Sequence, residues 1–200
     1  MLPFEPTAEP SALIPFAVRE SLRHARGLAW WEQKEKEFNY YTLGYSVRSQ
    51  LILGSEDHRS GGGFSLAVGR EDRQLRSGNV PGELIWEAYF MNTTSQGVNG
   101  DPPNSSASFG VLASGRWRWE FRRDVNFFGD VGFGIQWLNH TSNDVPLAFN
   151  TTPSFAFGVE FRTKGGAVLA GARLLHVSNA GRGTTNPGQN LLQWFIGFRY

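Results

Sequence analysis

The sequence contains no cysteine, so disulfide bonds and cysteine-ligated metal sites are excluded. An excess of charge of one sign is also missing. Lysine and arginine together number 19, against 18 for aspartate and glutamate, so there is no overall basic field to attract nucleic acid. We therefore expect no nucleic-acid partner. The absence of cysteine does not choose a cellular compartment, because many bacterial envelope proteins lack thiols.

Long apolar runs are absent as well. No stretch approaches the roughly 18 uninterrupted apolar residues that a transmembrane helix requires. Residues 1–12 show no basic segment followed by an apolar one, so a signal peptide is not visible. A strand of a membrane barrel, however, needs only about 10 residues of alternating character. The sequence therefore excludes membrane-spanning helices but not membrane-spanning strands.

Aromatic residues and glycine are abundant: the chain has 16 Phe, 7 Trp, 5 Tyr and 24 Gly. Their spacing follows a period of two, which places alternate residues of a strand on opposite faces. The segment 108–122 puts apolar side chains on one face and serine, arginine and glutamate on the other. The apolar set is Phe109, Val111, Ala113, Gly115, Trp117, Trp119 and Phe121. This pattern is typical of strands with one lipid-facing or core-facing side.

Segments with this alternation predict an all-β fold, an eight-stranded antiparallel up-and-down transmembrane β-barrel. The last strand ends on the aromatic residue Tyr200, an ending that resembles the terminal strand of bacterial outer-membrane proteins. We expect residues 38–200 to form the barrel and residues 1–37 an N-terminal arm or interfacial helix. A soluble sandwich or lipocalin-like barrel, with the apolar face inward, is the alternative. The expected strands are 39–53, 63–70, 83–91, 107–122, 126–139, 153–163, 166–178 and 189–200.

A periplasmic C-terminus would place the segments 54–63, 91–107, 139–152 and 179–189 on the outside of the cell. A barrel of this size is filled by its own side chains, so a channel or porin is not expected. Charged residues on the inward face predict a network in the lumen. Its expected members are Arg116, Arg118, Glu120, Glu160 and Arg162.

Three polar residues interrupt the apolar outward faces of the last two expected strands. His176 and Ser178 are an even number of residues from Leu174, so they lie on the same face of their strand as Leu174. Asn190 lies on the same face as Leu192 for the same reason. A hairpin centred near residue 183 would place Asn190 across from His176, within about 5.5 Å between backbones. Because polar groups on a lipid-facing surface are costly without a use, the trio indicates a nucleophile, base and orienter arrangement.

The surrounding motif resembles the lipid A 3-O-deacylase (acyloxyacyl hydrolase) family of outer-membrane barrels. It reads His-x-Ser-Asn-Ala-Gly from His176, then Asn-Pro-Gly from residue 186, with a polar residue fourteen positions after the histidine. The resemblance implies that Ser178 is the nucleophile and His176 the general base. It also implies an oxyanion hole formed by Asn179 and the Gly181 amide. The substrate would be lipid A, within lipopolysaccharide, or another lipid of the outer leaflet of the bacterial outer membrane.

Asn190 departs from that family's pattern, which has glutamate here. An amide oxygen can hold the histidine tautomer but supplies no charge to stabilise the imidazolium, so a slower or differently tuned enzyme is expected. The outer-membrane phospholipase A family is similar at this point, since its third member is asparagine. A phospholipase-type acyl hydrolase and a non-catalytic structural or adhesive barrel are therefore the alternatives. We expect no metal and no cofactor; the sequence leaves open whether the barrel forms a homodimer.

A second His-x-Ser occurs at His140 and Ser142. The position fourteen residues after His140 is Ser154, which is neither an acid nor an amide. Parity also places His140 inward. We therefore interpret His140 as a loop residue.

Overall fold

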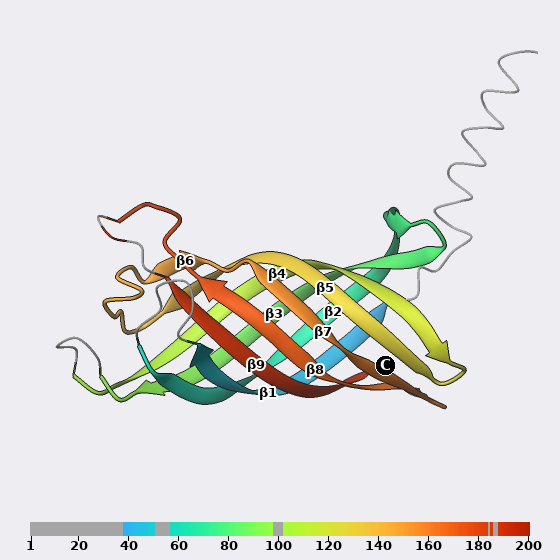
Figure 1. The fold of residues 1–200 in the computed structure, drawn as a ribbon, viewed down its shortest axis with the longest axis horizontal. Coiled ribbons are helices and arrows are strands. Elements are labelled where there is room, and N and C mark those ends of the chain that lie inside the picture. The colour runs from blue at the N-terminus through green and yellow to red at the C-terminus, as the bar shows by residue number, and fades with distance from the viewer. Residues whose placement is uncertain (1–37, 51–56, 98–101, 184, 186–187) are drawn as a thin grey trace, which may run out of the picture. The chain divides into compact units, whose positions relative to one another are not determined.

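The computed structural model describes residues 38–50, 57–97, 102–183, 185 and 188–200, and its regular elements there are all β-strands (Figure 1). The expected N-terminal arm or interfacial helix at 1–37 lies outside these residues. Within them, no helix is long and apolar enough to cross a membrane. The strands are β1 (Asn39–Gln50), β2 (Arg59–Ser77), β3 (Val80–Ser95), β4 (Asn104–Arg122), β5 (Val125–Leu138), β6 (Phe149–Thr151), β7 (Ser154–Thr163), β8 (Gly166–Val177) and β9 (Gln189–Arg199).

The strands close into a barrel because β1 pairs with both β2 and β9, and every pairing is antiparallel between neighbours. β6 and β7 act as one strand: both pair with β5 in the same register, and Thr152 continues it by exchanging backbone hydrogen bonds with Gly134. The break falls at Pro153, which has no N–H to donate. The expected eight-stranded antiparallel barrel is confirmed.

Several strands are longer than the alternation of apolar residues predicts. β2 continues past Arg70 to Ser77, where a two-residue turn at Gly78 and Asn79 leads into β3. Gly78 has a φ of 59°, a conformation that favours glycine. Backbone hydrogen bonding thus extends beyond the apolar band, where the side chains no longer alternate. β3 and β4 also continue through polar residues, β3 as far as Ser95 and β4 from Asn104 onward, and their side chains still alternate between buried and more exposed there.

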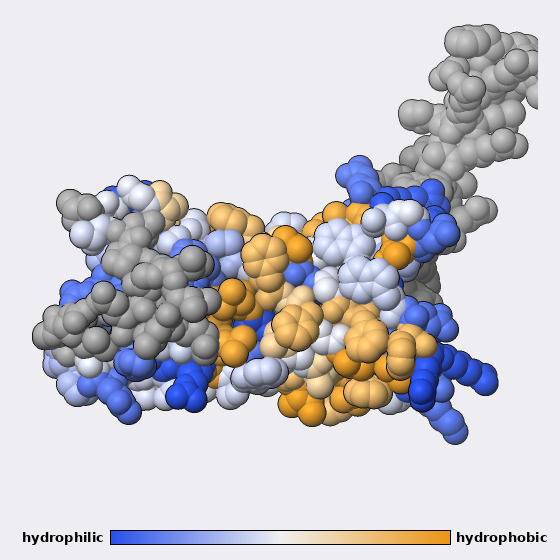
Figure 2. Space-filling view, viewed as in Figure 1, coloured by the Kyte–Doolittle hydropathy of each residue, from blue (hydrophilic) through white to orange (hydrophobic). Residues whose placement is uncertain are grey.

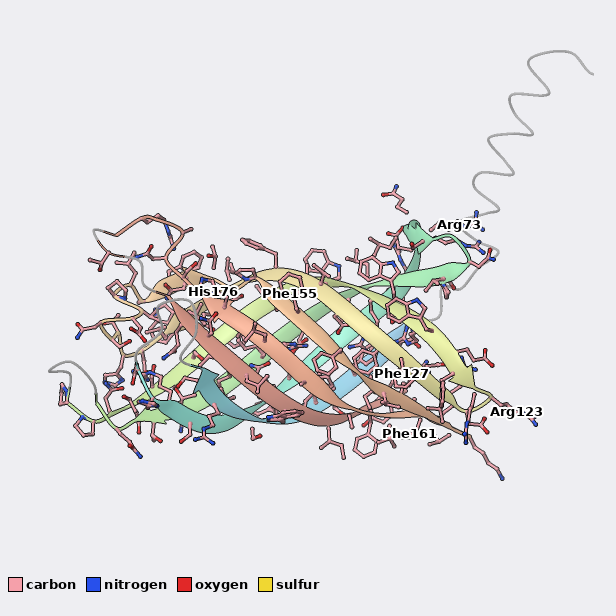
Figure 3. The ribbon with its side chains drawn as sticks, viewed as in Figure 1. Arg73, Arg123, Phe127, Phe155, Phe161 and His176 are labelled. Atoms are coloured by element: carbon pink, nitrogen blue, oxygen red, sulfur yellow. The ribbon has the colours of Figure 1, made fainter. Side chains whose placement is uncertain are left out.

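Large apolar side chains cover the outside of the barrel. Phe127, Phe155 and Phe161 point away from it (Figure 3), and Phe155 and Phe157 are more than 60% exposed. Figure 2 shows apolar side chains across the middle of the visible face, with hydrophilic residues gathered toward both ends. This is the outward arrangement of a membrane barrel, so the soluble alternative with its apolar face inward is wrong.

The lumen is filled by tyrosines, aliphatic side chains and buried ion pairs. Arg173 binds Glu87 through two hydrogen bonds of 2.8 and 2.6 Å, and Arg116 binds Asp130 through two of 2.7 Å. These pairs are nearly inaccessible to solvent. Bidentate geometry satisfies both carboxylate oxygens, which a buried charge needs. These side chains fill the lumen, as expected for a barrel of this size.

A second part of the network lies nearer the turns. Arg118 reaches both Glu83, at 2.7 Å, and Glu160, at 2.9 Å, while Arg199 contacts Glu160 from the last strand. Of the five residues expected in the lumen, Arg116, Arg118 and Glu160 are ion-paired there. Arg162 is exposed and reaches Asn126 Oδ1 at 3.4 Å. Glu120 is also exposed, two residues before the end of β4.

The two ends of the barrel differ. Two-residue turns join β2 to β3, β4 to β5 and β7 to β8, and the C-terminus lies at this end, hereafter the turn end (Figure 1). The opposite end, the loop end, carries the longer connections. There the segment 139–148 contributes Val145 to the buried core, and Asp144 accepts a hydrogen bond from the Asp57 amide.

Candidate active site

β8 and β9 bring two members of the predicted trio, His176 and Asn190, into contact at the loop end. Their register places His176 opposite Asn190, as the hairpin argument expects. His176 Nδ1 and Asn190 Oδ1 are 2.9 Å apart. Because an amide oxygen only accepts hydrogen bonds, Nδ1 carries the proton and donates it. Nε2 then keeps its lone pair, which is the form a general base requires.

Asn190 is fully buried although it belongs to the outward face, and His176 is half-buried. Figure 3 shows His176 near the loop end of β8. Burial removes Asn190 from competing water, so its amide is committed to protein contacts. The imidazole therefore has a fixed orientation and a partly open edge.

Ser178 lies two residues beyond His176 on the same face. Its backbone pairs with Thr151 in an isolated bridge, with Thr151 N donating to Ser178 O at 2.8 Å. The two side-chain hydroxyl oxygens are 3.3 Å apart. Among the described residues, no hydrogen bond joins Ser178 Oγ to the imidazole. Rotation about the Cα–Cβ bond of Ser178 changes the direction in which Oγ points.

Gly188 packs against the imidazole. A Cβ at this position would lie 2.7 Å from His176 Cε1 and 3.1 Å from Nε2. Its φ of 73° also favours glycine, and its amide donates to Asp144 O at 3.0 Å. Only a residue without a side chain lets the backbone approach the ring this closely. The sequence motif contains Gly188, but the alternation of residues gave no reason for it; Asn186 and Pro187 lie outside the described residues.

The two expected oxyanion donors are engaged within the loop after β8. Asn179 Nδ2 donates to Thr185 O at 2.7 Å, and the Gly181 amide donates to Asn179 Oδ1 at 2.9 Å. A tight turn begins at Asn179, whose carbonyl accepts from the Arg182 amide at 3.2 Å. Ala180, inside this turn, has a φ of 54°, a strained conformation for a residue with a side chain.

Thr151 is a neighbour of the trio that sequence reasoning missed, and Gly188 is one that the motif contained without a stated role. Thr151 belongs to a segment expected to be an exterior loop, 139–152, whereas β6 in fact extends the sheet there. His140 lies apart from the trio: it lines a small pocket at the loop end of the lumen with Arg59 and Ser142. No cluster of histidine, cysteine or acidic residues suited to a metal occurs in the part of the chain that the structure describes.

Comparison with known proteins gave one family and several similar folds. The profile of the family described as lipid A 3-O-deacylase (PagL) matches residues 60–199, which include the whole trio. The crystal structure of the outer membrane enzyme PagL superposes with a TM-score of 0.59 at 17% identity, covering 78% of this chain and 97% of that one.

Two other solved barrels are less similar. Neisserial surface protein A has a TM-score of 0.49 at 15% identity, covering 81% of this chain and 95% of its own. Ail of Yersinia pestis has a TM-score of 0.46 at 14% identity, covering 82% and 99%. A search of curated protein sequences gave no match.

Proposed function

Because this chain belongs to the lipid A 3-O-deacylase family of outer-membrane barrels, we propose that it hydrolyses the ester-linked acyl chain at the 3-position of lipid A. The observation that carries the proposal is the 2.9 Å contact between His176 and Asn190, with Ser178 on the same outward face. The loop end would then face the cell exterior, where the outer leaflet holds such esters.

The proposed reaction is acyl transfer through Ser178. Oγ attacks the ester carbonyl while His176 Nε2 takes its proton, and Asn190 Oδ1 holds the Nδ1 proton in place. The tetrahedral intermediate collapses when the carbon–oxygen bond to the sugar breaks and the imidazolium returns the proton to the leaving alkoxide. Water, deprotonated by the same nitrogen, then hydrolyses the acyl-serine and releases a fatty acid.

The oxyanion hole is part of this proposal. Asn179 Nδ2 and the Gly181 amide would have to exchange their loop partners for the substrate oxygen as the ester binds. Catalytic hydrogen bonds often reach their working geometry only in the complex with substrate. The strained φ of Ala180, between the two donors, is consistent with a turn held ready for that exchange.

A shallow groove on the outward face lies closer to the turn end than the trio and is suited to an acyl chain. Small residues line it, namely Gly44 and Ser46 from β1 and Ala170 from β8, beside Trp194 and Ile196 of β9. In the register of β8 and β9, Ala170 pairs with Ile196 on the same outward face as His176. An acyl chain in the leaflet can therefore follow this face away from an ester at Ser178.

The test is mass analysis of lipid A after incubation with the parent protein, Ser178→Ala and His176→Ala, each reconstituted in detergent. The parent should remove one hydroxyacyl chain, and both variants should lose activity by at least about 1,000-fold. Equal deacylation by all three proteins would reject the proposal. A parallel incubation with phospholipid, with and without calcium, tests the phospholipase alternative.

A further inference from the structure

Arg48 is a cation on the outward face close to the trio. On β1, the rung that joins His176 to Asn190 continues to Gln50, and the next outward position toward the turn end is Arg48, opposite Leu192. Diagonal neighbours on one face of a sheet have backbones about 7–8 Å apart. Arg48 and Asn190 are diagonal neighbours of this kind, and an extended arginine side chain spans that distance, so Arg48 reaches the Asn190 side of the proposed site.

The surroundings of Arg48 contain no acidic partner in the structure as described. Its cross-strand neighbours on the outward face are Ser60 and Leu192, and its side chain is exposed. No hydrogen bond or ion pair joins it to any described residue. A charge on a lipid-facing surface is costly and marks a functional position more often than a structural one.

The loop beside the trio holds another arginine, but that one is already committed. Arg182 donates from Nε to Asn179 O at 3.0 Å and from Nη2 to Phe149 O at 2.6 Å, and it stacks over the Phe149 ring. Its contacts hold the loop. Arg48 is therefore the arginine beside the trio whose donors are available to a ligand.

The available donors fit an anion held at the membrane surface. Arg48 lies near the loop end of β1, and a long cationic side chain there extends its head toward the lipid headgroups. A guanidinium binds phosphate through two parallel hydrogen bonds. Lipid phosphates lie at that level.

We propose that Arg48 binds the phosphate group of an anionic lipid and so positions that lipid's ester at Ser178. The position of the ester at Ser178 rests on the proposed function, whereas the binding of phosphate by Arg48 does not. Phosphate on a glycolipid such as lipid A and phosphate on a glycerophospholipid present the same chemistry to Arg48. The experiment distinguishes the two sources.

Binding is measured by native mass spectrometry on the full chain carrying Ser178→Ala, which prevents turnover. The probes are diphosphorylated lipid A, the same lipid after enzymatic dephosphorylation, dioleoylphosphatidylglycerol and dioleoylglycerol. Adding Arg48→Gln should weaken binding of a phosphorylated probe by about 10- to 100-fold, the loss expected for a charge-assisted pair. Binding of the unphosphorylated probes should not change.

Arg70 provides the matched control, because it is an arginine on the outward face of β2 near the turn end. Arg70→Gln should leave all four affinities unchanged. If Arg48→Gln weakens binding of lipid A alone, the ligand of Arg48 is the phosphate of a glycolipid. If it weakens binding of phosphatidylglycerol equally, the ligand is lipid phosphate in general. Both outcomes support the proposal. Equal weakening of phosphorylated and unphosphorylated probes, or no effect of Arg48→Gln, would overturn it.

A kinetic measurement applies if the parent hydrolyses lipid A. Arg48→Gln should then raise KM for the phosphorylated lipid while kcat stays within about 3-fold, because binding and not the chemical step is affected. Arg48→Lys should restore part of the affinity, since it keeps the charge but loses the fork. If the parent shows no hydrolysis, the proposed function fails, and the binding result still decides the role of Arg48.

Discussion

At the scale of single residues, the third member of the trio is a neutral amide. Asn190 orients His176 through Nδ1, but it would add no negative charge beside the ring if the ring took a proton. In serine hydrolases an acid at this position both fixes the tautomer and stabilises the imidazolium, and its replacement by asparagine is costly. The geometry of this chain therefore retains the first role and gives up the second.

Asn190→Asp should raise kcat by about 10-fold, because a carboxylate stabilises the imidazolium that forms in the transition state. Asn190→Leu should lower kcat by at least about 100-fold. The measurement is initial-rate kinetics on lipid A in detergent. Asn150→Asp is the control, since Asn150 is equally buried but inward-facing; a comparable rate increase in that variant, or none in Asn190→Asp, would contradict the account.

Gly188→Ala should lower kcat by about 10- to 100-fold while the barrel still folds. The new methyl group would lie 2.7 Å from His176 Cε1 and displace the ring from Asn190, and small misplacements of a catalytic group have effects of this size. Gly78→Ala is the matched control, because Gly78 also has a positive φ but has open space around it. A similar loss of activity in both variants would assign the effect to backbone strain.

At the scale of elements, the register of β8 and β9 was predictable and the surrounding loops were not. A period of two and a hairpin centre together fix which residues face each other, so the contact of His176 with Asn190 follows from residue numbers alone. The contact between Thr151 and Ser178 depends on β6, whose segment reads as a polar loop. Asn179 bonds to atoms of its own turn, and such local choices leave no periodic signal.

The shallow groove beside Ala170 can be tested by filling it with a larger side chain. Ala170→Phe should raise KM for lipid A by about 10-fold or more, because the ring would occupy the path of the acyl chain beside Ile196. Hydrolysis of a short ester such as p-nitrophenyl butyrate should be unaffected. Ala88→Phe, at an exposed position on the outward face of β3, should change neither rate; equal effects on long and short esters would argue against an acyl groove here.

At the scale of the whole molecule, apolar side chains lie outside and paired charges lie inside. The alternation of residues predicted this inversion, including the lumen positions of Arg116, Arg118 and Glu160. It could not predict the pairing of Arg173 with Glu87, because the partners are 86 residues apart and meet only across the closed barrel. The alternation of residues along a strand predicts which face a residue lies on, whereas the closing of the barrel determines which residues it contacts across the lumen.

Arg173→Met should lower the free energy of unfolding by about 3–5 kcal/mol, since it leaves the buried Glu87 carboxylate unpaired. The double variant Arg173→Met/Glu87→Met should recover most of that loss, because it removes both charges. Urea unfolding in liposomes, followed by tryptophan fluorescence, gives both values. If the double variant is as unstable as the single one, the unpaired Glu87 carboxylate is not the cause of the loss, and this explanation is wrong.

The central claim, that the outward-facing trio is an esterase site, is tested most directly by covalent labelling of the serine. The full chain in detergent is treated with an acyl fluorophosphonate, and the modified peptide is identified by mass spectrometry. The account predicts labelling at Ser178 that is lost in Ser178→Ala and slowed by at least about 100-fold in His176→Ala. An unlabelled Ser178, or labelling that does not depend on His176, would contradict it.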